Sequence, residues 1–106
     1  MDEVERAFRI SVLLSLQRAL WDIVTPDLRG VAVTPSSPII RARFIYEAVN
    51  PDLLELVSEA ETTVYADFLP PINVQFVGVS EPLPARRLLE AGEEWFYLRR
   101  ERPINE

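Results

Sequence analysis

Most side chains that carry out enzyme chemistry are missing from this chain of 106 residues. It contains no histidine or cysteine, and all eleven basic residues are arginine. A general base near neutral pH, a thiolate nucleophile and a Schiff-base amine are therefore absent. Glu93 and Glu94 are adjacent acids, but neighbouring residues of a strand point to opposite faces. The three glycines are scattered and form no phosphate-binding loop. We therefore expect no enzyme activity, no metal site and no cofactor.

One predicted helix, from Asn50 to Phe68, carries acidic residues and no basic residue. Asn50 can cap its first turn, and Pro51 suits the first helical position. The residues at helical spacing that should form its buried stripe are Leu53, Val57, Ala60, Val64 and Phe68. No basic residue occurs between Arg43 and Arg86 to neutralise its carboxylates.

Asp52, Glu55, Glu59 and Thr62 follow helical spacing on another side of this helix and form its acidic face, with Glu61 and Asp67 nearby. Asp52 also lies at the positive end of the helix dipole, which favours a negative charge there. One interpretation is an ordinary solvated surface, which is what charge runs usually form. The other is a docking surface for a basic partner protein.

A second candidate surface combines arginine with aromatic side chains. Apolar residues alternate with Arg41 and Arg43 from Ile40 to Glu47, as in a strand whose arginines face outward. The last strand is predicted from Trp95 to Arg100, with Phe96 and Leu98 directed to the core. The sheet face that is predicted to be open would then carry Arg41, Arg43, Trp95, Tyr97 and Arg99.

Such a face could bind single-stranded RNA if bases stacked on Trp95 and Tyr97 between the arginines. The net charge of -6 argues against this function. Binding to a phosphate backbone gains affinity from a clustered basic surface. Exposed aromatic residues on a sheet suit contacts with another protein equally well.

The first helix is predicted from Asp2 to Val24, because the residue before Pro26 is disfavoured in a helix. Its main apolar side should face the core. A second, narrower apolar side carries Ala7, Ile10, Leu14 and Trp21. We expect these residues to be covered by a neighbouring helix or the proline-rich connection from Ser80 to Glu94, or else to contact a second copy of the chain or a partner.

Three further segments complete the prediction. Strands are expected from Leu28 to Thr34 and from Ile72 to Val79, bounded by proline-rich turns. One helical turn is expected from Arg86 to Ala91. The tail from Glu101 to Glu106 is predicted to be frayed.

The order helix, strand, strand, helix, strand, strand indicates an α+β two-layer sandwich in a single domain, residues 1–106. Both helices should pack on one face of a four-stranded, mostly antiparallel sheet. The second helix should make a right-handed crossover that leaves the second and third strands parallel or near neighbours. The predicted core consists of Phe8, Val12, Leu16, Leu20, Phe44, Tyr46, Val57, Val64, Val74, Phe76, Phe96 and Leu98.

The composition predicts a cytoplasmic protein. The absence of cysteine fits a reducing compartment. The acidic start of the chain and its interrupted apolar run predict neither a signal peptide nor a membrane helix.

Four segments resemble a known group of proteins: residues 25–33 (TPDLRGVAV), 40–46 (IRARFIY), 66–68 (ADF) and 95–100 (WFYLRR). Together they are similar to small bacterial immunity proteins encoded beside contact-dependent growth inhibition and related polymorphic toxin systems. The resemblance runs from Leu13 to Glu101. It implies a cytosolic inhibitor that binds and neutralises one cognate toxin domain, often a nuclease. It transfers no binding residue, since these families vary at the toxin-binding surface.

The residues themselves leave a further alternative open. A homodimeric structural or interaction domain, joined through the first helix or the open sheet face, would use the same apolar and aromatic side chains.

Overall fold

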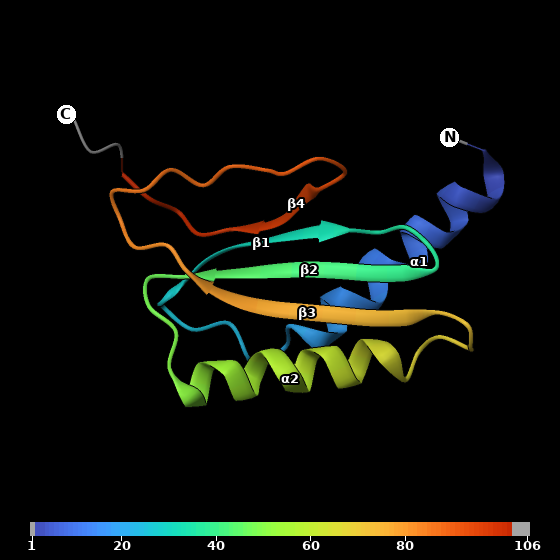
Figure 1. Cartoon of the computed structure of the whole chain (residues 1–106), viewed down its shortest axis with the longest axis horizontal. Coiled ribbons are helices and arrows are strands. Elements are labelled where there is room, and N and C mark those ends of the chain that lie inside the picture. Colours follow the sequence, from blue (N-terminus) through green and yellow to red (C-terminus); the bar gives the residue numbers. More distant parts are fainter. Residues whose placement is uncertain (1, 103–106) are drawn as a thin grey trace.

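The computed structural model describes residues 2–102 and contains two helices and four strands (Figure 1). In chain order they are α1 (Glu3–Ala19), β1 (Leu28–Thr34), β2 (Ile39–Tyr46), α2 (Pro51–Tyr65), β3 (Asn73–Ser80) and β4 (Glu94–Leu98). This order confirms the predicted α+β arrangement.

The four strands form one mixed sheet in the order β3-β2-β1-β4. β1 pairs antiparallel with both β2 and β4, while β2 pairs parallel with β3. The parallel pair follows from α2, which crosses over between the two strands and packs against the sheet. The predicted relation between the second and third strands is therefore confirmed.

The helix α1 ends earlier than the sequence predicted. The Asp2 carboxylate caps it by accepting a hydrogen bond of 2.7 Å from the Glu5 amide. It ends at Ala19 rather than Val24, and Asp22 in the following turn has a left-handed backbone with φ of 67°. Aspartate is one of the few residues that adopt this conformation readily. The helix therefore ends at a turn that precedes Pro26.

The helix α2 has the predicted start and a shorter end. The Asn50 side chain accepts a hydrogen bond of 2.8 Å from the Leu53 amide, which confirms the cap. The helix ends at Tyr65 instead of Phe68. Beyond it the Asp67 amide bonds to the Val64 carbonyl, which tightens the last turn.

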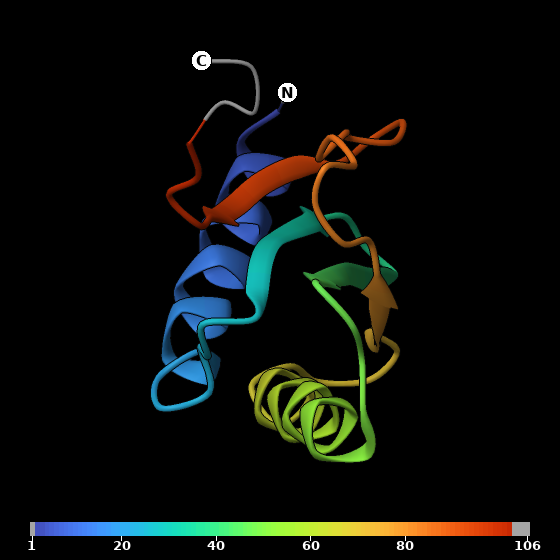
Figure 2. The ribbon, with the colours of Figure 1, turned by 90° about the vertical axis from the view of Figure 1, so that its left-hand side faces the viewer.

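Both helices lie on the same side of the sheet, and the core fills the space between these layers (Figure 2). The predicted core residues that are buried there are Val12, Leu16, Leu20, Phe44, Tyr46, Val57, Val64, Val74 and Phe76. Phe8 and Phe96 are half-buried and pack against this cluster. Leu98 was predicted in the core, but 47 % of its surface is exposed.

An irregularity in β4 explains this error. Val31 pairs with Tyr97, but the next residue of β1, Ala32, pairs with Trp95, so the ladder skips Phe96. Such a bulge shifts the alternation of faces by one residue. Tyr97 therefore packs against the core with Phe96, and the prediction that Tyr97 lies on the opposite face is wrong.

Gly30 of β1 faces Leu98 and Trp95 across this irregular pairing. A Cβ atom at Gly30 would lie 3.2 Å from Cζ3 of Trp95 and 3.2 Å from the carbonyl oxygen of Tyr97. The missing side chain thus lets β4 approach β1 closely.

The 81–93 loop, which joins β3 to β4 and forms no helical turn, packs over part of the second face of the sheet (Figure 2). Ala32 and Ile45 point to this face and are fully buried. The prediction of a helical turn from Arg86 to Ala91 is wrong. The face that was predicted to be open is therefore partly covered, while Arg41 and Val77 remain exposed on it.

The second apolar side of α1 is not under this loop, because the loop and α1 lie on opposite faces of the sheet. Ile10, Leu14 and Trp21 are exposed, with 59 % of Leu14 and 67 % of Trp21 accessible. The expectation that a helix or the loop covers them is therefore wrong. A second copy or a partner on this side stays a prediction.

Candidate functional site

The outer side of α2 carries three carboxylates that no cation of the described residues neutralises. Asp52, Glu55 and Glu59 are exposed, and none forms an ion pair with any residue of the described range 2–102. The opposite side of the helix is held in the core by Leu53, Val57, Ala60 and Val64. The helix therefore holds the three charges outward on a rigid element.

Glu61, predicted to lie near the acidic face, has a different environment. It is half-buried, and its Oε2 accepts a hydrogen bond of 2.8 Å from the Phe76 amide. Phe76 belongs to β3, an edge strand of the sheet. Glu61 thus satisfies a backbone donor on that edge in addition to carrying charge.

Arg43 is a structural residue on the covered face. Its guanidinium binds both carboxylate oxygens of Glu93 at 2.8 Å and donates to the Leu88 carbonyl at 3.0 Å. Glu81 and Glu90 lie 3.7 and 3.8 Å from it. The bond from Arg43 lowers the pKa of Glu93 below its ordinary value. Arg43 therefore fastens the 81–93 loop to the sheet.

The other residues predicted for that face are dispersed. Arg41 is exposed and has no carboxylate within 4.0 Å among residues 2–102. Trp95 is half-buried beside Gly30. With Tyr97 packed on the core and Arg43 held by Glu93, the flat stacking platform that single-stranded RNA requires is not formed.

A cluster centred on Glu101 was missed by sequence reasoning. The Glu101 carboxylate accepts hydrogen bonds of 2.9 and 3.0 Å from Arg29, and bonds of 3.1 and 2.8 Å from Arg99. Arg87 contributes a third cation, with its Nε 3.3 Å from Glu101. The bond from Arg29 lowers the pKa of Glu101 below its ordinary value, and the other arginines add to this effect.

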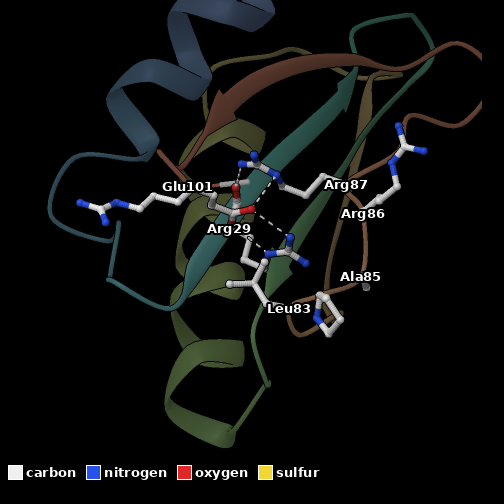
Figure 3. Close-up of a pocket in the computed structure, with 8 residues that line it drawn as sticks. Arg29, Leu83, Ala85, Arg86, Arg87 and Glu101 are labelled. Atoms are coloured by element: carbon white, nitrogen blue, oxygen red, sulfur yellow. Dashed lines mark hydrogen bonds and ion pairs between the residues drawn. The ribbon is translucent and has the colours of Figure 1, made fainter. Parts of the chain in front are cut away.

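This cluster connects Glu101, which follows β4, to β1 and the 81–93 loop (Figure 3). Arg29, Arg87 and Glu101 point toward one another, whereas Arg86 points away from them. Arg99 also donates to Glu47, a bond that lowers the pKa of that carboxyl group. The prediction that the tail frays from Glu101 onward is wrong for Glu101, while residues 103–106 lie outside the described range.

Neither a metal site nor a membrane helix is found in the described part of the chain. No group of three or more metal-binding side chains comes together among residues 2–102. No helix in this range is both long and apolar enough to cross a bilayer. The arrangement offers an exposed acidic surface for binding. Ser15 donates a hydrogen bond of 2.6 Å to the Asp67 carboxylate, which is also paired with Arg18.

Comparison with known proteins gives one match. A family model described as MafI2 immunity protein matches residues 9–101, which span most of α1, the rest of the α+β fold and Glu101. No curated protein and no solved structure matches the chain. The family agrees with the resemblance seen in the sequence. The chain belongs to the MafI2 immunity protein family.

Proposed function

We propose that this chain acts in the bacterial cytoplasm, where it binds and neutralises one cognate toxin domain through the acidic face of α2. The observation that carries the proposal is the exposure of Asp52, Glu55 and Glu59 without a cationic partner in the described range. The family supplies the class of function, immunity. The unpaired carboxylates of α2 are the reason for proposing this face as the binding surface.

A nuclease is the toxin that fits this surface best. A nuclease must attract a phosphate backbone, so it presents a basic cleft. An acidic protein surface that enters or borders such a cleft competes with the nucleic acid, and the opposite charges accelerate association. Rapid association matters for an immunity protein, because free toxin damages the cell until it is bound.

Co-expression with the toxin domain encoded by the neighbouring gene tests this function. The variant Asp52→Lys, Glu55→Lys, Glu59→Lys should lose protection of growth and inhibition of purified toxin, although it folds. The control reverses Glu3, Glu5 and Asp27, which are exposed elsewhere on the molecule and give the same change of net charge. Because Glu3 pairs with Arg6, thermal unfolding must verify that this variant folds as well. Equal protection by both variants would reject the acidic face as the docking surface.

The exposed side of α1 favours a second candidate function, association of two copies. Ile10 and Leu14 are exposed on α1, and Trp21 is exposed in the turn that follows it. A monomeric protein seldom leaves such side chains bare. A homodimer formed through α1 would cover them and leave the acidic face of α2 free for the toxin.

A further inference from the structure

A hollow opens beside the C-terminal half of α2, where the helix passes the start of β3. Its volume is about 250 Å³, and it is lined by Glu61, Thr62, Tyr65, Asn73 and Val74. A second hollow of about 360 Å³ is lined by Glu55, Ser58, Glu59, Thr62 and Thr63. Because Thr62 borders both, the first hollow continues the acidic face.

The carboxylate in this hollow is held in place with one oxygen free. Oε2 of Glu61 accepts the bond from the Phe76 amide, which fixes the side chain against β3. Oε1 of Glu61 accepts no hydrogen bond and forms no ion pair within residues 2–102. A preorganised carboxylate oxygen therefore remains available to a donor from outside.

An aromatic residue, Tyr65, lines the same hollow as Glu61. Tyr65 follows Glu61 by four residues, so the two side chains are neighbours on the same side of α2. Tyr65 is 53 % exposed, although it is a large aromatic residue near the end of a packed helix. A carboxylate next to an exposed aromatic face is the environment that a guanidinium group prefers, since it forms an ion pair and stacks at once.

The chain does not place one of its own arginines in this hollow. The nearest basic residues in the sequence are Arg43 and Arg86, and Arg43 is bound to Glu93. All five residues that line the hollow are acidic, polar or apolar. The cation that would complete the site must come from another molecule.

We infer that this hollow receives an arginine side chain of the bound toxin, whose guanidinium pairs with Oε1 of Glu61 and stacks on Tyr65. The inference rests on the proposed function and deepens it. Asp52, Glu55 and Glu59 are solvated charges, so they act mainly on the rate of association. The arginine is partly desolvated in the hollow, so its contacts act on the rate of dissociation and fix the orientation of the toxin.

Dissociation rates of the complex with the neighbouring toxin domain test the inference. Tyr65→Leu removes the aromatic face and should raise the dissociation rate about tenfold, whereas Tyr65→Phe should stay within about twofold of the native rate. Glu61→Gln keeps an acceptor for the Phe76 amide while removing the charge, and it should also raise the rate about tenfold. Thermal unfolding of each variant verifies that the fold is retained.

The double variant Glu61→Gln, Tyr65→Leu adds a sharper criterion. Because both residues contact the same guanidinium, the combined effect should be smaller than the product of the single effects. Unchanged dissociation for Tyr65→Leu and Glu61→Gln would overturn the inference. If the reversal of Asp52, Glu55 and Glu59 still slowed association, the proposed function would stand without it, whereas no effect of any of these changes would reject both.

Discussion

Glu101 and Arg29 are 72 residues apart in the chain, yet they meet through two parallel hydrogen bonds of 2.9 and 3.0 Å. Their side chains are only 9 % and 2 % exposed. Arg29 also donates to the Glu81 carbonyl at 2.6 Å, so a single guanidinium holds the end of the chain and the start of the 81–93 loop. The pair ties the layer on the second face of the sheet to β1.

This pair predicts a pH-dependent stability. Glu101 has a depressed pKa in the folded state, so its contribution is present above the unfolded value of about 4.3 and is lost as the pH falls through the folded value. Glu101→Gln should lower the free energy of unfolding by about 2–4 kcal/mol at pH 7, because Arg29 loses its charged partner. Denaturant unfolding across pH should show this difference shrinking below about pH 4. A difference that stays constant to pH 3 would contradict the role of the pair.

The ion pair between Arg43 and Glu93 predicts a local effect on hydrogen exchange in the 81–93 loop. Arg43→Gln should release the 81–93 loop, so its backbone amides should exchange with solvent faster while those of α1 and α2 keep their protection. Arg41→Gln is the matched control, because Arg41 lies on the same strand and face without a carboxylate partner in the described range. Equal amide exchange of the loop in both variants would show that the Arg43–Glu93 ion pair does not hold the loop on the sheet.

Tyr46 is buried, and its hydroxyl has no hydrogen-bond partner among residues 2–102. Burial raises the pKa of this phenol. Tyr46→Phe removes an unsatisfied polar group while keeping the ring, so stability should be unchanged or higher by up to about 1 kcal/mol. Tyr46→Ala is the comparison, with an expected cost of about 3–5 kcal/mol for the lost ring. A clear loss of stability in Tyr46→Phe would reveal a partner for the hydroxyl.

Association through α1 predicts a dimer at high protein concentration. Leu14→Glu and Trp21→Glu place charge on the exposed apolar side and should convert the protein to a monomer without loss of stability, since neither side chain is in the core. Sedimentation velocity over a wide concentration range measures this. A native protein that remains monomeric throughout would remove the second candidate function.

The order of helices and strands could be predicted because strand alternation and helix capping depend on residues close together in the sequence. The period-two pattern around Phe44 and the Asn50 cap depend on near neighbours, and both are observed. The sequence did not predict the bulge that exchanges the faces of Tyr97 and Leu98. A bulge depends on the pairing with the neighbouring strand, so it cannot be seen in the alternation of β4 alone. Sequence reasoning likewise missed the role of Glu101, whose partner Arg29 is distant in the chain.

The candidate site was also predicted only in part. Exposure of Asp52 and Glu55 follows from helical periodicity, so the sequence identified the acidic face. Arg43 was predicted to be free because the sequence does not reveal that a long loop returns to bring Glu93 against it. The hollow at Tyr65 depends on how α2 lies beside β3, which is a property of tertiary packing.

The association rate of the chain with its cognate toxin domain, measured from low to high ionic strength, tests the central claim most directly. If Asp52, Glu55 and Glu59 steer the complex, the native rate should fall steeply as salt screens the attraction. Reversal of these three residues to Lys should slow association about tenfold or more at low salt and flatten the salt dependence. The reversal of Glu3, Glu5 and Asp27 should leave a salt dependence close to that of the native chain. An unchanged rate and an unchanged salt slope after the reversal on α2 would contradict the account.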